Sequence, residues 1–123
     1  MRFTLESTTQ VNTVRAYSPQ ELRIGQTVVR ASCIVTAERL ITEWTPVCFE
    51  ALEEAHLEDI FALEPQIVLL GTGARQRFAP APIRAAFSAR AIGLEMMDLG
   101  AACRTFNILV HEDRRVAAAL FFA

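Results

Sequence analysis

Short apolar runs alternate with polar segments that contain Gly or Pro along the whole chain. In the second half, residues 66–70, 94–98 and 116–122 are strand-like runs, and residues 101–112 between the last two have helical spacing. Strand-like runs separated by helical patterns are typical of a largely parallel sheet with crossover helices. The pattern therefore predicts the α/β fold class.

The first half has a different pattern. Residues 2–47 contain short strand-like runs joined by turns, among them residues 11–17, 32–36 and 40–44. Gly25-Gln26 lies between two further runs, and a two-residue loop that begins with Gly suits a type II′ hairpin. Pro46 ends the pattern because proline cannot donate to a β-ladder. We expect antiparallel hairpins in this half.

Two more segments have helical spacing. Residues 48–64 carry apolar side chains at helical intervals with most of the acids off that stripe, which predicts one amphipathic helix or two short ones packed on the sheet. Pro65 ends this segment. Pro80 and Pro82 bracket the start of another helix, since proline suits the first helical turn. About three helices are therefore expected in all.

The chain has 123 residues, of which 52% are apolar and 21% charged. This length is sufficient to bury a core and typical of one domain. We expect a single compact domain over residues 1–123, with a mixed central β-sheet, parallel C-terminal strands and antiparallel N-terminal hairpins. No internal repeat or linker divides it.

Charge is unevenly distributed along the chain. The formal net charge is −2, which argues against a general surface for nucleic acid or anionic membrane. Residues 38–64 hold eight acids and one base, whereas residues 65–94 hold four Arg and no acid. Two surfaces of opposite charge would orient a partner. The alternative is a pair of solvated faces that happen to cluster.

The three cysteines, Cys33, Cys48 and Cys103, form no Cys-x-x-Cys motif and no Cys/His cluster. We expect no metal site and no framework typical of a secreted protein, which fits a reducing compartment. No apolar run approaches the roughly 20 residues of a spanning helix, and residues 1–6 lack the apolar core of a signal peptide. The predicted location is cytoplasmic, without membrane insertion.

A glycine-rich motif follows the first strand-like run of the second half. The residues of this candidate anion-binding site are Gly71, Thr72, Gly73, Arg75 and Arg77. Backbone N–H groups after a strand can hold an anion, and the two Arg would supply charge. The motif is too short for a dinucleotide fingerprint and lacks the Gly-Lys-Ser/Thr of a P-loop. The alternative, which we favour, is a tight strand exit that needs glycine dihedral angles.

A second candidate site is a buried polar cluster of Glu95, Asp98, Arg104 and Asn107. Glu95 interrupts an apolar strand, and burying a carboxylate is costly unless a cation or hydrogen-bond donors meet it. One interpretation, which we favour, is an ion pair with Arg104, Arg114 or Arg115, and the other is a general base whose pKa is raised by burial. Asp98 is expected to cap the last helix.

Two longer runs carry a family resemblance. LLGTGARQRF and GLEMMDLGAACRTFNILVHEDRRVAAALF, in residues 69–78 and 93–121, resemble the Mth938-like (DUF498) family. This family includes the mitochondrial complex I assembly factor 3 proteins and many small bacterial proteins. Leu99 and Phe106 depart from the family pattern, in which Thr and Tyr are common. The resemblance implies a compact α/β domain with a mixed central sheet and no established enzymatic activity.

The resemblance also implies a role. The animal relatives look like chaperones for assembly of a respiratory membrane complex, so we expect a non-enzymatic protein-interaction domain that acts as an assembly factor. The expected partner is an unidentified protein, and homo-oligomers remain open. No catalytic residue, metal, cofactor or nucleic acid is expected. The alternative is a small anionic-ligand binder or enzyme that uses the loop of residues 71–73 with Glu95 and Arg104.

Overall fold

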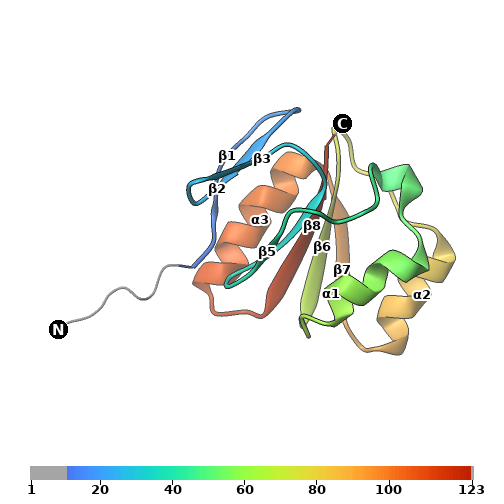
Figure 1. The fold of residues 1–123 in the computed structure, drawn as a ribbon. Coiled ribbons are helices and arrows are strands. Elements are labelled where there is room, and N and C mark those ends of the chain that lie inside the picture. Colours follow the sequence, from blue (N-terminus) through green and yellow to red (C-terminus); the bar gives the residue numbers. More distant parts are fainter. Residues whose placement is uncertain (1–10, 123) are drawn as a thin grey trace.

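A computed structural model describes residues 11–122 (Figure 1). Its elements are, in order, β1 (Val14–Tyr17), β2 (Leu22–Ile24), β3 (Thr27–Val29), β4 (Cys33–Thr36), β5 (Leu40–Ile41), the 3-10 turns η1 (Phe49–Ala51) and η2 (Glu54–Leu57), α1 (Glu58–Phe61), β6 (Ile67–Thr72), α2 (Ala81–Ala89), β7 (Gly93–Met97), α3 (Leu99–His111) and β8 (Val116–Phe121). The expectations for residues 2–10, and the absence of a signal peptide in residues 1–6, lie outside the described residues.

The centre is a five-stranded sheet with the strand order β5-β4-β8-β6-β7. β6 pairs in parallel with both neighbours, so that Leu69 lies opposite Glu95 of β7 and Ala118 of β8. β4 runs antiparallel to both β8 and β5. The three strand-like runs of the C-terminal half are therefore neighbours in one mixed sheet, and the predicted α/β fold class with parallel C-terminal strands is confirmed.

A second, antiparallel sheet has the order β1-β2-β3. Gly25 has a φ of +59° at the first position of the loop between β2 and β3, as a type II′ turn requires. The predicted N-terminal hairpins are thus confirmed. The predicted return strand of residues 40–44 is shorter than expected, because only Leu40 and Ile41 pair with β4.

Helices cover both faces of the central sheet (Figure 1). Side chains alternate along β6, so Leu69 packs in the same cluster as α3, whereas Val68 and Leu70 pack with α2 and the η1–α1 segment. A strand that is buried on both faces reads as a continuous apolar run. This explains why β6 has no polar side chain between Ile67 and Leu70.

The small sheet packs on α3. Its buried side chains Val14, Leu22, Ile24 and Val29 belong to the same apolar cluster as Phe106 of α3 and Leu69 of β6. Helix α3 therefore lies between two sheets, and Tyr17 at the end of β1 lies against Gly100 in the first turn of α3. The sequence pattern did not predict this layer.

Residues 48–64 form three short pieces, η1, η2 and α1, where one helix or two short ones were predicted. The backbone is extended at Leu52 and Glu53, which separates η1 from η2. Glu53 and His56 then cap each other reciprocally, since each side chain accepts the backbone N–H of the other. The predicted apolar stripe is nevertheless buried, as Leu57 and Ile60 show.

Candidate functional site

Packing requires one glycine of the Gly71-Thr72-Gly73 motif, and backbone conformation requires the other. Gly71 is buried, and a Cβ built on it would lie 3.0 Å from Leu120 Cδ2 and 3.1 Å from Ala102 Cβ. The close packing of β6 against α3 therefore leaves no room for a larger side chain. Gly73 has a φ of +92°, which other residues rarely adopt.

Thr72 holds the loop of residues 73–80 in place. Its buried Oγ1 lies 2.7 Å from the carbonyl oxygen of Arg75 and 3.2 Å from that of Met97, and it accepts the N–H of Arg77 at 3.1 Å. One hydroxyl thus closes the loop on itself and ties it to the end of β7.

Arg77 is committed to structural contacts. Its Nη2 donates to the carbonyl oxygen of Thr72 at 3.1 Å, and its Nη1 donates to the carboxylate of Glu50. The guanidinium carbon lies 4.9 Å from the ring centroid of Phe49. The hydrogen bond from Arg77 holds the pKa of the exposed Glu50 carboxyl below its usual range. Of the two predicted cations, Arg75 is the one that is exposed to solvent.

Glu95 is exposed, so the prediction of a buried carboxylate at this position is wrong. The reason is the strand order, because β7 lies at the edge of the sheet and has no neighbour on its outer side. Both interpretations of Glu95, the ion pair with an arginine and the general base of raised pKa, required a buried carboxylate and therefore have no support here.

The side chains of Asp98 and Asn107 both form hydrogen bonds with backbone groups. Asp98 is the N-cap of α3, where its Oδ1 accepts the N–H of Ala101 at 2.8 Å, so the predicted cap is confirmed. Asn107 accepts the N–H of Val14 at 2.8 Å and donates to the carbonyl oxygen of Val14 at 2.9 Å. The Asn107 amide thereby binds β1 to α3 through one donor and one acceptor, the same pair of groups that a neighbouring strand would offer.

A third contact completes this attachment. The ring of Tyr17 lies over Gly100, where a Cβ would be only 2.8 Å from Tyr17 Cε1. Arg104 Nη1 donates to the Tyr17 hydroxyl at 2.5 Å. Residues 100, 104 and 107 share one face of a helix at i, i+4 and i+7, so this stripe of α3 receives β1. Tyr17 was not predicted as a site residue, and the sequence signal for this contact was Gly100, a small residue in the first turn of α3.

We predict that Asn107→Ala lowers the free energy of unfolding by about 2 kcal/mol, because the backbone N–H and carbonyl of Val14 lose their partners. Urea unfolding gives the loss, and amide hydrogen exchange should show faster exchange at Val14. The matched control is His111→Ala, an exposed change on the same helix, which we expect to stay within about 0.5 kcal/mol. Unchanged exchange at Val14 would contradict this role for Asn107.

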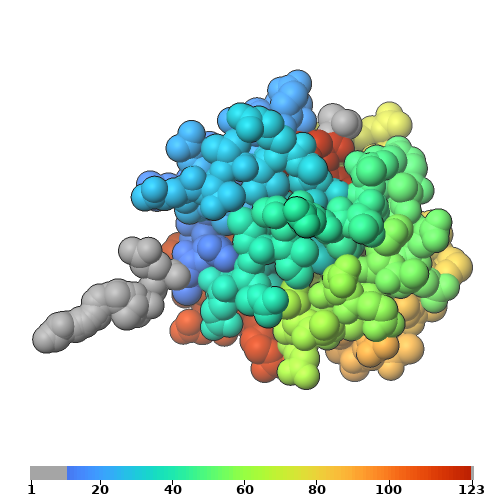
Figure 2. Space-filling model, viewed as in Figure 1, coloured from blue at the N-terminus to red at the C-terminus, as the bar shows by residue number. Residues whose placement is uncertain are grey.

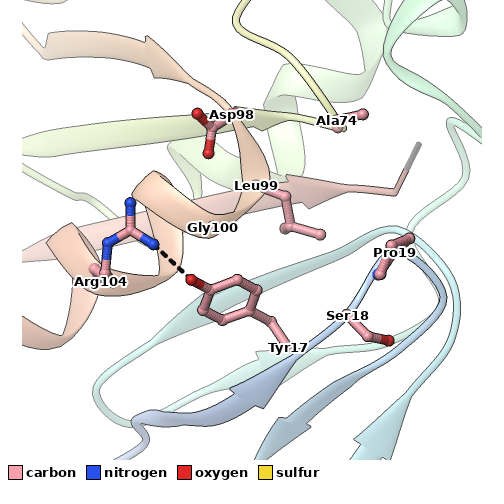
Figure 3. A pocket seen from close by; sticks show the side chains of 9 residues that line it. Tyr17, Ser18, Pro19, Ala74, Asp98, Leu99, Gly100 and Arg104 are labelled. Carbon is pink, nitrogen blue, oxygen red and sulfur yellow. Dashed lines mark hydrogen bonds between the residues drawn. The ribbon is translucent and has the colours of Figure 1, made fainter.

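A cavity of about 310 Å³ opens beside the Tyr17 contact, at the ends of β6 and β7 where α3 begins (Figure 3). Its lining residues are Tyr17, Ser18, Pro19, Gly73, Ala74, Asp98, Leu99, Gly100 and Arg104. The cavity thus brings together Gly73 of the first candidate site with Asp98 and Arg104 of the second. Arg75, Arg77, Glu95 and Asn107 do not line it. Ligands of open α/β sheets bind outside the carboxyl ends of the strands, which is where this cavity lies.

Two of the thiols are buried inside the fold. Cys33 and Cys103 both belong to the cluster between the sheet and α3. Burial, the largest cause, raises the pKa of each thiol to about 12. Both therefore stay protonated at neutral pH, which makes them poor nucleophiles.

The raised thiol pKa predicts a loss of stability at alkaline pH. Unfolded thiols lose their protons near pH 9, whereas the folded ones keep them up to about pH 12. The unfolded state binds fewer protons in this window, so the free energy of unfolding falls as pH rises through it. We expect the fall between about pH 8 and about pH 10.5 to be smaller in Cys103→Ala than in the unchanged chain. Equal falls, measured by urea unfolding, would contradict the burial of this thiol.

Within residues 11–122, no cluster of three or more His, Cys, Asp or Glu side chains could hold a metal ion. None of the helices described there is long and apolar enough to cross a membrane.

Comparison with known proteins places the fold. A family model described as "Protein of unknown function (DUF498/DUF598)" matches residues 14–121. The chain belongs to this family. The solution structure of a Bordetella pertussis protein described as a Mth938-like domain is 25% identical, with a TM-score of 0.81, and covers 98% of this chain and 92% of its own. A Xanthomonas campestris protein is 36% identical with a TM-score of 0.82, over 89% of this chain and 83% of its own. The family predicted from the motifs is thus confirmed.

Curated relatives of the DUF498 chain carry two kinds of name. NADH dehydrogenase [ubiquinone] 1 alpha subcomplex assembly factor 3 of Danio rerio is 34% identical over 109 residues, which are 87% of this chain and 62% of that protein. The 13 kDa major membrane protein of Francisella tularensis is 34% identical over 68 residues, 55% of each chain. The chain spans 62% or less of the length of these relatives, and of the two names only the second states a location, the membrane.

Proposed function

We propose that this DUF498 domain binds a partner protein and assists the assembly of a larger complex, without catalysing a reaction. The observation that carries the proposal is similarity over 87% of the chain to proteins named as assembly factors, in Danio rerio and in Homo sapiens alike. The three free thiols support a cytoplasmic site of action, because a reducing compartment preserves them.

The contacts of the polar side chains support binding over chemistry. Thr72, Asp98 and Asn107 each hydrogen-bond to backbone groups that shape the fold. The Arg77 guanidinium is paired with Glu50. A general base or nucleophile needs a free group within reach of a substrate, and these four side chains are occupied instead in holding loops and strands.

Co-purification tests the proposal. The tagged chain, expressed at native level in its own cell, should recover a reproducible set of proteins that are subunits of one complex, at low and moderate salt. Light scattering of the purified chain alone, at several concentrations, decides whether it also associates with itself. Recovery of nothing above an untagged background at either salt concentration would contradict the proposal.

The cavity at Gly73 and Arg104 favours a second candidate function, the binding of a small anionic ligand. Arg104 supplies a cation to its lining, whereas the positive end of α3 is already capped by the carboxylate of Asp98, which lines the same cavity. A ligand that binds only the folded chain raises the melting temperature. Phosphates, nucleotides and carboxylates should therefore be screened by thermal shift with Arg104→Leu as the control. No shift across the panel would remove this candidate.

A further inference from the structure

The loop of residues 73–80 holds an aromatic side chain in solvent. Phe78 is 70% exposed, although its neighbours on both sides are fixed. Arg77 is bound through its side chain to Thr72 and Glu50, as described above. Ala79 is buried, its N–H lies 3.1 Å from Met96 Sδ, and its carbonyl oxygen accepts from Arg84 Nε at 2.9 Å. A large apolar side chain exposed on a fixed backbone is preorganised for binding.

A second exposed apolar side chain, Val47, lies in the adjoining segment and is 85% exposed. This segment is also fixed, since the Ser32 hydroxyl donates to the carbonyl oxygen of Pro46. The ion pair of Arg77 with Glu50 ties it to the loop that carries Phe78. Figure 2 shows the yellow loop projecting from the surface next to the green η1 turn.

The segment that carries Phe78 contributes exposed basic side chains and no acid. Arg75 in the loop and Arg84 in the first turn of α2 are exposed, and residues 65–94 contain no acid. We call Val47, Phe78, Arg75 and Arg84 the Phe78 face. The exposed acids that the structure ties to this loop are Glu50, which is paired with Arg77, and Glu95, next to Met96, whose carbonyl oxygen accepts from Gln76 Nε2 at 3.3 Å.

We infer that the Phe78 face binds a segment of a partner protein that combines acidic residues with one aromatic or large aliphatic side chain. This inference rests on the proposed function. Contact of the apolar side chain with Phe78 and Val47 supplies most of the affinity, as buried aromatic anchors do at interfaces. The partner's acids face Arg75 and Arg84, which fixes the orientation of the segment and speeds association. Added salt therefore weakens binding.

Selection from a displayed library of random peptides tests the inference with the purified chain alone. We expect enriched peptides to contain several Asp or Glu and at least one Phe, Trp, Leu or Ile. For an enriched peptide, fluorescence polarisation should show about tenfold weaker binding to Phe78→Ser. The variant Arg75→Glu, which leaves the bond from Arg84 to Ala79 in place, should also weaken binding and reduce its dependence on salt.

Matched controls lie elsewhere on the surface. Ile108→Ser removes another exposed apolar side chain, on α3, and Arg15→Glu makes the same change of net charge on the small sheet. Both should bind the peptide as the unchanged chain does. Enrichment of no peptide, of neutral or basic peptides, or of peptides that bind Phe78→Ser equally well would overturn the inference. Partners recovered from cells would still support the proposed function in that case, so the two failures are distinguishable.

Discussion

Replacing Phe121 with alanine lowers the free energy of unfolding by about 4 kcal/mol. Phe121 ends β8 and is 0% exposed. Its ring centroid lies 5.3 Å from that of Trp44 and 5.9 Å from that of Phe49, and these contacts hold the irregular segment before η2 on the sheet. The truncation removes the apolar area of the ring and leaves a cavity that rigid strands on either side cannot close.

Urea unfolding measures this loss, and the chain offers a matched control. Phe78→Ala deletes the same ring from a site that is 70% exposed, so we expect a change within about 0.5 kcal/mol. A loss below about 1 kcal/mol for Phe121→Ala would mean that the aromatic cluster does not anchor the segment of residues 44–49.

Gly71→Val should lower the free energy of unfolding by about 3 kcal/mol. The new Cβ would lie 3.0 Å from Leu120 Cδ2, 3.1 Å from Ala102 Cβ and 3.5 Å from Leu99 Cα. Leu120 can adjust its side chain, but Ala102 and the backbone of Leu99 belong to α3 and move only with the helix. The two γ-methyl groups of valine enlarge the clash, so α3 must shift away from β6.

Thermal and urea unfolding of the purified variant give the size of this effect. The control is Gly93→Ala on the adjacent strand, where a Cβ would meet its nearest atoms at 3.7 Å and 3.8 Å, which is ordinary van der Waals contact. We expect this change to cost under about 1 kcal/mol. Equal stability of Gly71→Val and Gly93→Ala would contradict the close packing of α3 on β6.

Most strands and helices were predictable from the sequence because each run carries its own local signal. β6 is apolar throughout, Gly25 occupies the first position of its turn, and the polar Asp98 stands where a helix cap is needed. Such features depend on a few adjacent residues. The family motifs then selected one arrangement among those that the pattern allowed, and the confirmed fold follows from both.

The candidate sites were harder to predict because they depend on contacts between distant parts of the chain. Glu95 is exposed only because β7 lies at the edge of the sheet, which its own sequence does not reveal. Tyr17 and Arg104 meet across 87 positions. Arg77 was a plausible ligand cation until its contacts with Glu50 and Thr72 were seen. Charge alone does not tell a structural arginine from a binding one.

Leu99 and Phe106, the two departures from the family pattern, are both buried among apolar side chains. Leu99 is buried at the start of α3, and its N–H donates to the carbonyl oxygen of Gly73 at 2.8 Å. Phe106 is fully buried in the cluster between the two sheets. An apolar side chain suits both positions, because a buried hydroxyl there would need a hydrogen-bond partner.

Complementation in cells that lack this chain tests most directly whether it works by binding. The measurement is the amount, on native gels, of the complex whose subunits co-purify with the chain. We predict that the complex is depleted without the chain and restored by the unchanged chain, by Cys103→Ala and by Arg104→Leu, but not by Phe78→Ser. Full restoration by Phe78→Ser together with failure of Cys103→Ala or Arg104→Leu would contradict the account, because the function would then depend on chemistry at α3.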